Sequence, residues 1–310
     1  MPIAIALNSP GLDGGDATAT APPPWRPKVA LVIGSGSLKC AAAFGVVKVL
    51  QAHSIPIDLV VGCSGGAFCA SWVAAGGGDA HEAAERFARG WQGAFRRVDY
   101  RAILSAVFPR LLRFDSRASI VDDRAINAAI RGYVGESTFE GLPTPLYLVA
   151  TDFISGEPVL LHQGRLDDAI RATIALPLIL PPWPVAGRHL VDGAVCNPLP
   201  VDVAVKEGAD IIIAVGFEDP LASRFDSGAG LVRQLITLLV NHLYRAQFAF
   251  YNLVHHAETL IIVPQIEQRV GLDDVHLVPY LVERGAVAAE AEVPYLLRLL
   301  ATPRRSRPLP

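Results

Sequence analysis

Short, unbroken apolar runs recur along the chain between longer segments of mixed polarity. Four of them are Val29–Ile33, Leu146–Ala150, Ile211–Val215 and Leu260–Val263. Apolar runs of this length, with no polar alternation, are typical of strands buried on both faces of a parallel sheet. Such a sheet also explains why hydrophobic residues make up 51% of the chain and charged residues only 18%. The pattern predicts an α/β fold with a central, mostly parallel sheet.

Another apolar run leads directly into a glycine-rich turn. Residues 57–61 precede Gly62-Cys63-Ser64-Gly65-Gly66, and a stretch of small residues from Ala67 to Ala75 has helical character. A G-x-S-x-G sequence between a strand and a helix is typical of a nucleophile elbow, where glycine neighbours let the chain pass through a tight turn. The motif indicates a serine hydrolase with Ser64 as nucleophile. An ordinary strand-to-helix turn is the alternative that the motif alone leaves open.

A second loop of small residues follows the first predicted strand. Gly34-Ser35-Gly36-Ser37-Leu38-Lys39 precedes a helical stretch from Cys40 to Ala52. Backbone N–H groups in such a loop form a nest for an anion, either a phosphate or an oxyanion. The chain has no G-x-x-x-x-G-K-[ST] sequence, and Lys39 stands where a G-x-G-x-x-G motif needs its third glycine. Nucleotide binding is therefore the lesser alternative.

A carboxylate follows a third short apolar run. His189-Leu-Val191 leads into Asp192-Gly193-Ala194, so Asp192 is expected at a strand end with Gly193 letting the loop turn. An Asp-Gly pair is more often a turn that binds its own backbone. Among the neighbouring polar residues, Asn197 is expected to steady this loop, Asp152 to cap a loop and Asp202 to cap a helix.

The order and spacing of these motifs resemble the bacterial patatin-like phospholipase family over residues 28–300. The matching stretches are Gly34–Lys39 with Gly45–Leu50, Gly62–Ala67, Ala150–Asp152 with Ser155–Pro158, and Ala169–Thr173 through Leu180–Pro182 to Asp192–Val201. The resemblance implies a three-layer α/β/α fold and a Ser–Asp dyad that hydrolyses acyl esters of lipids. It implies no metal ion and no cofactor.

The resemblance also implies a role for each matching residue. Ser64 resembles the nucleophile and Asp192 its base. Gly36 and Ser37 resemble the oxyanion hole, with Lys39 as its basic neighbour. Four glycines are expected to support the elbow and the Asp192 loop: Gly62, Gly65, Gly66 and Gly193.

The sequence departs from the family pattern in the oxyanion loop. Ser35 and Ser37 replace the outer two of three consecutive glycines, and Cys40 replaces a further glycine. Backbone donors do not require glycine, but a positive φ makes serine costly. The elbow carries Cys63 and Gly65 where threonine and alanine are usual. These changes remove no catalytic atom, although they bear on efficiency.

A Ser–Asp–His triad is a second possibility among hydrolases. The order Ser64, Asp192 and then a histidine suits the α/β-hydrolase arrangement, and the candidate histidines are His242, His255, His256 and His276. Three of them lie in a long helical stretch from Gly230 to Ala257, and His276 lies in a polar loop. The loop before the first helix favours the dyad.

Charge and cysteine content narrow the function classes. The formal net charge of −3 argues against a nucleic-acid binder, which needs a basic excess. The four cysteines show no metal-ligand spacing, so buried thiols are expected; they are Cys40, Cys63, Cys69 and Cys196. Reduced cysteines and the absence of a basic secretory signal predict a cytoplasmic protein. A peripheral position at a membrane surface is the alternative.

The chain divides into one predicted domain and two predicted flexible ends. Residues 1–27 form a leader rich in glycine, alanine and proline, residues 28–300 the hydrolase domain, and residues 301–310 a tail. The uncharged run Leu59–Gly78 is long enough to span a membrane, but its glycines favour a buried strand and helix. Oligomeric state is left open.

Two apolar segments are candidates for lipid contact. Ile103, Leu104, Val107, Phe108, Leu111 and Leu112 recur at helical spacing among arginines, as in a lid or a membrane-surface patch, or in a core-facing helix pair. The helical stretch from Leu231 to Val254 predicts a wall of an acyl-chain tunnel or a helix packed on the sheet. The predicted function is a lipid acyl hydrolase; a transacylase and a non-hydrolytic acyl-ligand binder are the alternatives.

Overall fold

The computed structural model describes residues 26–94, 123–177, 179–218, 221, 228–253 and 257–302. Most of the predicted leader and tail lie outside these ranges. So do the apolar segment from Ile103 to Leu112, His255 and His256. The last helix ends at Ala301, one residue into the predicted tail.

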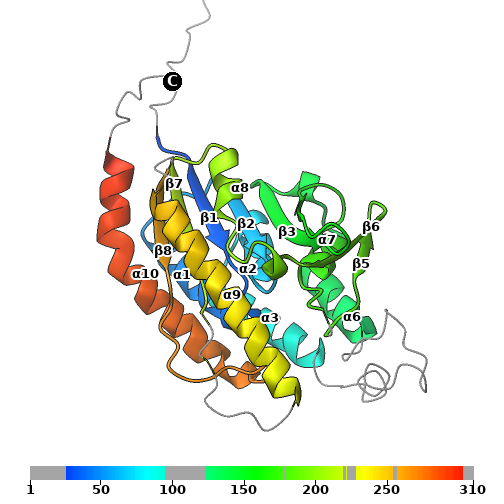
Figure 1. The fold of residues 1–310 in the computed structure, drawn as a ribbon. Helices are drawn as coiled ribbons and strands as arrows, with labels where there is room; N and C mark the ends of the chain where they lie inside the picture. Colours follow the sequence, from blue (N-terminus) through cyan, green and yellow to red (C-terminus); the bar gives the residue numbers. More distant parts are fainter. Residues whose placement is uncertain are drawn as a thin grey trace, which may run out of the picture.

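An eight-stranded sheet forms the centre of the described part of the fold (Figure 1). Its strand order is β5-β6-β3-β2-β1-β7-β8, with β4 paired to β3. The five parallel strands are β1 (Val29–Ile33), β2 (Leu59–Cys63), β3 (Leu146–Asp152), β7 (Ile211–Val215) and β8 (Glu258–Ile262). The antiparallel strands at one end are β4 (Pro158–Leu161), β5 (Trp183–Val185) and β6 (Arg188–Asp192).

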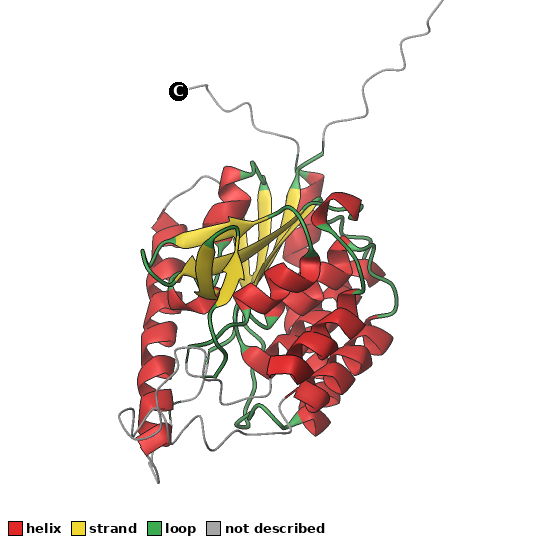
Figure 2. Cartoon of the chain, turned by 90° about the vertical axis from the view of Figure 1, so that its right-hand side faces the viewer, coloured by secondary structure: helices red, strands yellow, loops and turns green. Residues whose placement is uncertain are grey.

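Helices cover both faces of the sheet, which confirms the predicted three-layer α/β/α architecture (Figure 2). One layer contains α1 (Ala42–Ala52), α2 (Gly66–Ala74), α3 (Ala80–Ala94), α6 (Asp123–Val134), α7 (Leu166–Thr173) and α10 (Val278–Ala301). The other contains α8 (Val201–Lys206) and α9 (Gly228–Leu253). Single 3₁₀ turns are η1 (Ser37–Ala41), η2 (Phe139–Gly141), η3 (Gly193–Val195) and η4 (Val275–Leu277).

Burial on both faces explains the unbroken apolar runs. Successive side chains of a strand point to opposite faces. In β1, Leu31 packs into the core beneath α1 and α10, whereas Val32 packs into the core beneath α8 and α9. All five residues of β1 are fully buried, so neither face tolerates a polar side chain.

Two glycines allow α1 and α10 to cross at backbone contact. A Cβ atom on Gly45 would overlap the carbonyl oxygen of Val282, and one on Gly285 would overlap that of Ala42. The close crossing holds the last helix against the helix that follows β1. Among the described residues, none of the helices combines the length and apolar composition of a membrane span. The uncharged run from Leu59 instead forms β2 and α2, as predicted.

The register of the central strands aligns the ends that carry the motifs. Ile33 at the end of β1 pairs with Gly62 of β2. Cys63 at the end of β2 pairs with Val149 of β3, and the next residue of β3, Ala150, pairs with Asp192. Because the carboxyl ends of parallel strands meet at one edge, this edge is where α/β folds place their sites.

Candidate active site

Ser64 occupies a sharp turn between β2 and α2. Its φ of +53° lies in the left-handed region, which costs a non-glycine residue conformational energy and is often found at functional sites. The residue is only 9% exposed, and α2 begins two residues later. This strand–turn–helix geometry is that of a nucleophile elbow.

Ser64 donates a hydrogen bond directly to a carboxylate. Its Oγ lies 2.7 Å from Oδ2 of Asp192, although the two residues are 128 positions apart in the chain. The other carboxylate oxygen, Oδ1, accepts the backbone N–H of Ala194 at 2.8 Å. Both oxygens of Asp192 therefore have defined partners, and one of them faces the serine hydroxyl with no intervening side chain.

Burial changes the acidity of this carboxyl group. Asp192 is 3% exposed, and the loss of hydration raises its pKa to about 6 despite the hydrogen bonds from Ala194 and Ser64, which lower it. A carboxyl group with this pKa is largely ionised at neutral pH and can accept a proton far more readily than one of ordinary acidity.

The predicted supporting glycines are needed for close packing. A Cβ on Gly65 would lie 2.5 Å from the carbonyl oxygen of Ser37, and one on Gly66 would lie 2.6 Å from that of Gly34. The elbow thus touches the loop after β1 along two backbone contacts. On the opposite side, a Cβ on Gly62 would lie 2.8 Å from the Cβ of Ala70.

The sequence predicts that Gly193 lets the Asp192 loop turn, but the structure shows a different reason for glycine at this position. It lies in the short turn η3 and does not have a positive φ. A Cβ there would instead overlap the carbonyl oxygen of Val149, and would lie 2.9 Å from Sγ of Cys63. Glycine is required because the Asp192 loop lies directly against β2 and β3.

In the described part of the chain, three backbone donors of the loop after β1 make no hydrogen bond: those of Gly36, Ser37 and Leu38. Gly34 N–H bonds to Val215, Ser35 N–H to Pro198 and Lys39 N–H to Gly36. Within the described part of the chain, the N–H groups of Gly36 and Ser37 make no such bond. Ser37 has a φ of +52°, whereas Ser35 does not have a positive φ. Of the two serines that replace glycines in this loop, only Ser37 therefore carries the conformational cost of a positive φ.

Lys39 does not offer a backbone N–H to an oxyanion. The residue is 3% exposed, its N–H bonds to Gly36, and its Nζ donates to the carbonyl oxygen of Glu218 at 3.2 Å. Lys39 therefore ties the loop after β1 to the segment after β7.

The end of α7 holds the backbones of both Ser64 and Asp192, a feature the sequence did not reveal. Thr173 Oγ1 accepts the Ser64 N–H at 2.9 Å and donates to the carbonyl oxygen of Val149. Two residues on, the carbonyl oxygen of Ala175 accepts the Asp192 N–H at 3.0 Å. One short segment thus sets the separation of the two side chains.

Tyr244 on α9 is a second contact missed from the sequence. Its fully buried hydroxyl donates to the carbonyl oxygen of Ser35 and lies 3.2 Å from that of Pro198. The tyrosine therefore links the loop after β1 to the loop after Asp192. Its position in an apolar helical stretch gave no sign of this role.

The other polar residues near the site have structural partners. Asn197 steadies its loop as expected, donating to Asp202 at 2.7 Å and accepting from Gln247 at 2.7 Å. The expectation that Asp202 caps α8 is wrong, because Pro200 occupies the N-cap without a side-chain bond and Asp202 binds Asn197 and Lys206 instead. Asp152 caps its loop through the N–H groups of Ile154 and Ser155.

The described histidines do not support the triad. His242 and His276 are both exposed, and the Asp192 carboxylate bonds directly to Ser64. Cys40, Cys63 and Cys69 are buried, as predicted for thiols, whereas Cys196 is half-buried. The described residues contain no cluster of side chains suited to a metal ion.

The structure thus places a buried serine on a strand–turn–helix elbow of an α/β/α fold, with its hydroxyl hydrogen-bonded to a carboxylate. A model of the patatin-like phospholipase family matches residues 31–205, more than half of the chain. The chain belongs to the patatin-like phospholipase family.

The chain is also similar to individual known proteins. An uncharacterized NTE family protein of Mycobacterium tuberculosis is 37% identical over 189 residues, covering 61% of this chain and 49% of that protein. Mouse patatin-like phospholipase domain-containing protein 6 is 31% identical over 189 residues, 60% of this chain and 13% of that protein. The match thus spans about half of the mycobacterial relative. The crystal structure of VipD from Legionella pneumophila aligns with a TM-score of 0.46 at 14% identity, covering 89% of this chain and 67% of VipD.

Replacing Thr173 tests the importance of the α7 segment. Thr173→Val keeps the shape of the side chain but leaves the Ser64 N–H and the Val149 carbonyl without their partner. We expect kcat to fall by roughly 10²-fold with KM nearly unchanged, because a small displacement of a reacting group is costly. Thr173→Ser should restore the activity, since it restores the hydroxyl. A parallel change in kcat and KM, or no rescue by serine, would assign Thr173 a purely structural part.

Proposed function

We propose that the protein hydrolyses acyl esters of lipids through a Ser64–Asp192 dyad. The observation that carries the proposal is the 2.7 Å hydrogen bond from the Ser64 hydroxyl to a buried carboxylate whose pKa is about 6. Membership of the patatin-like phospholipase family supports lipid esters as the substrate class.

In the first half-reaction, Ser64 Oγ attacks the ester carbonyl carbon while Asp192 takes the hydroxyl proton. The carbonyl oxygen becomes negative as the tetrahedral intermediate forms. Asp192 then returns the proton to the leaving alcohol oxygen as its bond to carbon breaks. The product of this half-reaction is an acyl-Ser64 ester and a free alcohol.

In the second half-reaction, a water molecule takes the place of the alcohol. Asp192 accepts a proton from the water as its oxygen attacks the acyl carbon, and the proton returns to Ser64 Oγ as the acyl–enzyme bond breaks. The fatty acid is released and the hydroxyl is restored. If another alcohol replaces water in this step, the same residues perform acyl transfer.

The free N–H groups of Gly36 and Ser37 are suited to hold the oxyanion. The loop that carries them is in backbone contact with the elbow at Gly65 and Gly66. Removing one oxyanion donor typically costs about 10²–10³ in rate. The N-terminus of α2, directly after Ser64, adds a favourable field for negative charge.

Product analysis tests the proposal. The purified chain is incubated with vesicles of a diacyl phospholipid, with a simple ester of a fatty acid beside it, in the presence and absence of EDTA. We expect free fatty acid to be released at rates that EDTA does not change. Acyl groups that appear only on an added alcohol acceptor would indicate a transacylase. Absence of turnover in a folded protein that binds the lipid would favour the non-hydrolytic alternative.

The acidity of Asp192 predicts the pH dependence of the reaction. Only the ionised carboxylate can accept a proton, and burial holds its pKa at about 6. We therefore expect kcat/KM to rise with pH through an apparent pKa near 6 and to reach a plateau above it. Initial rates on a soluble ester, measured from about pH 4.5 to about pH 8, check this. A rate that stays constant down to the ordinary range of an aspartate would contradict it.

A further inference from the structure

One face of α9 presents apolar side chains to solvent along most of the helix. The helix crosses the front of the sheet in Figure 1 and forms the outer boundary of its layer in Figure 2. At 3.6 residues per turn, six of its exposed positions fall within about a quarter of the helix circumference. These six residues form the α9 stripe: Leu231, Leu235, Leu239, His242, Ala246 and Ala249. The leucines are 58%, 57% and 57% exposed, and a continuous apolar surface of this kind marks an interaction site.

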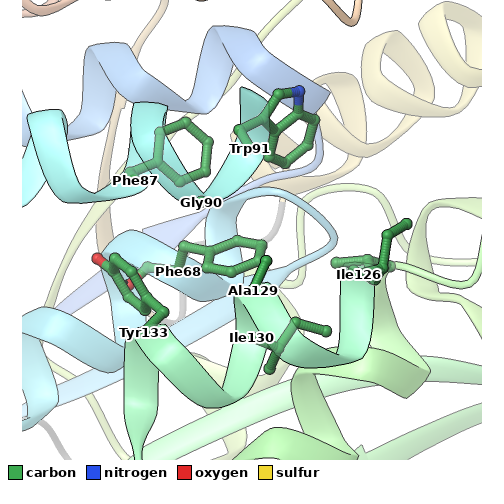
Figure 3. A pocket seen from close by; sticks show the side chains of 9 residues that line it. Phe68, Phe87, Gly90, Trp91, Ile126, Ala129, Ile130 and Tyr133 are labelled. Carbon is green, nitrogen blue, oxygen red and sulfur yellow. The ribbon is translucent and has the colours of Figure 1, made fainter. Parts of the chain in front are cut away.

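The contact between α3 and α6 shows how this fold covers an apolar helix face. Phe87 and Trp91 of α3 and Ile126 and Ile130 of α6 are all buried there. The space left among these side chains is a cavity of about 20 Å³ (Figure 3), which holds no more than about one water molecule. The leucines of the α9 stripe have the same apolar character but no comparable cover from the described residues.

The α9 stripe has the spacing of a seam between two helices. From Leu235 to Ala249 its positions are separated by four, three, four and three residues. This alternation lets the side chains of one helix insert between those of another. From Leu231 to Ala249 the stripe is about 27 Å long, and two helices that pair along such a length bury on the order of 1,000 Å², the lower end of specific interfaces. The stripe is therefore large enough for a helix partner.

Side-chain size divides the α9 stripe into two halves. Leucines occupy the half before His242 and alanines the half after it. If a second α9 runs antiparallel to the first, the leucines of each copy lie on the alanines of the other, so the helix axes keep one separation along the whole seam. A parallel pair sets leucine on leucine at one end and alanine on alanine at the other, which leaves a gap. The stripe is thus complementary to itself, as a twofold interface requires.

A membrane surface is the other apolar environment that such a stripe can meet. Helices that lie on anionic membranes carry basic side chains beside large apolar ones. The arginine beside the α9 stripe, Arg245, is already paired with Glu218 at 3.1 Å, and the chain has a formal net charge of −3. The alanines of the stripe also add little apolar area for insertion. These features favour a protein partner.

We propose that α9 is the dimer interface of this protein, paired antiparallel with α9 of a second copy. His242 lies near the middle of the stripe and therefore near the twofold axis, where a polar residue in an otherwise apolar seam fixes the register. The inference concerns the assembly of the chain and holds whichever reaction the Ser64 site performs.

Pairing also acts on the helix that supports the candidate active site. Tyr244 lies on the buried face of α9 and links the loop after β1 to the loop after Asp192. Gln247 of the same helix donates to Asn197 at 2.7 Å. A second copy on the exposed face holds α9 in place from outside. We therefore expect the unfolding temperature of the unmodified chain to fall on dilution.

Sedimentation velocity over a dilution series tests the dimer. We expect the unmodified chain to sediment with twice the mass of one chain and to dissociate on dilution. Leu235→Glu places two carboxylates in the seam, and Kd should rise about 10²-fold or more, because charges buried without a partner are costly. Glutamate is a good helix former, so the variant should remain folded, with an unfolding temperature that no longer depends on concentration.

Leu297→Glu is the matched control. Leu297 is 44% exposed on α10, in the other helix layer. The same exchange at this position should leave the dimer and its dissociation on dilution unchanged.

A pair of complementary charges tests the orientation. Leu235→Lys and Ala249→Glu should each weaken the dimer, whereas an equimolar mixture of the two variants should form a mixed dimer, seen by native mass spectrometry. In an antiparallel pair, the introduced lysine of one copy lies near the introduced glutamate of the other. In a parallel pair the two lie about 21 Å apart along the seam. A mixture that gains nothing over either variant alone would overturn the antiparallel arrangement.

Other results would overturn the dimer itself. A monomer at every concentration, or a dimer that Leu235→Glu leaves intact, would show that α9 does not hold two copies together. A monomeric chain that floats with vesicles of phosphatidylcholine and phosphatidylglycerol, and loses this binding in Leu235→Glu, would assign the α9 stripe to a membrane surface instead.

Discussion

Ser64→Ala and Asp192→Asn should each abolish ester hydrolysis in a protein that still folds. Removing the nucleophile of a serine hydrolase costs on the order of 10⁶ in kcat. Asparagine keeps the shape of Asp192 and can still accept from the Ala194 N–H, but it cannot take the serine proton. Since general base catalysis contributes about 10²–10⁴-fold, we expect a kcat loss of at least that size. Initial rates on a soluble ester measure both effects.

Stability provides an independent readout for Asp192→Asn. The folded-state pKa of about 6 lies above the ordinary value of 3.8, so the folded state binds the proton more tightly than the unfolded state. The resulting stabilisation is complete below the ordinary pKa and is lost as the pH rises through 6. Asparagine does not titrate, so the variant should gain stability relative to the unmodified chain between about pH 4 and pH 7, by up to about 3 kcal/mol. Denaturant unfolding of the variant and of the unmodified chain, at both ends of this pH range, measures the difference in stability.

Asp210→Asn is the control for the activity measurements on Ser64→Ala and Asp192→Asn. Asp210 accepts the Lys28 N–H at 2.9 Å, where the chain enters β1 and β7, at the opposite ends of those strands from the candidate site. The turnover rate of Asp210→Asn should stay within about twofold of that of the unmodified chain. Hydrolysis that survives Asp192→Asn but fails in a histidine variant would favour a triad.

Gly193→Ala should have the next largest effect. A single methyl group there overlaps the Val149 carbonyl oxygen, so the loop must move away from β3 and carry Asp192 with it. Displacements of about 1 Å at a reacting group can cost 10²-fold, and we expect a kcat loss of at least that order. Overpacking of this kind also typically costs about 1–3 kcal/mol of stability. Kinetics and thermal unfolding of the same preparation measure the two losses.

Val195→Ala is the matched control for Gly193→Ala. Val195 belongs to the same short turn η3, but the residue is 47% exposed. Its replacement should change neither turnover nor unfolding appreciably. A Gly193→Ala variant with full activity would show that the Asp192 loop has more freedom than its contacts with β3 indicate.

The parallel core was predictable because strands that are buried on both faces appear in the sequence as unbroken apolar runs. The predicted bounds of β1 and β7 agree with the structure residue for residue. β2 begins two residues later than predicted, because Asp58 lies before the strand and its carboxylate accepts the Val29 N–H. The antiparallel strands β4 and β5 were not predicted; they are short, partly exposed and contain proline.

The candidate site was predictable where its chemistry is local in sequence. The elbow and the loop after β1 are short motifs, and Asp192 emerged from the family resemblance. Thr173 and Tyr244 could not be found in this way, because Thr173 lies 109 residues from Ser64 and Tyr244 lies 209 residues from Ser35. Their hydroxyl groups act only through contacts that the fold creates, and threonine and tyrosine are unremarkable in the helices that carry them.

Labelling with a fluorophosphonate ester tests the central claim most directly. Such a reagent reacts with a serine only when a base activates the hydroxyl and backbone donors hold the phosphoryl oxygen. The account predicts one adduct by intact mass, located on Ser64 by peptide mapping, with none on Ser64→Ala and slower labelling below about pH 6. A folded protein that gains no adduct, or gains it on another residue, would contradict the account.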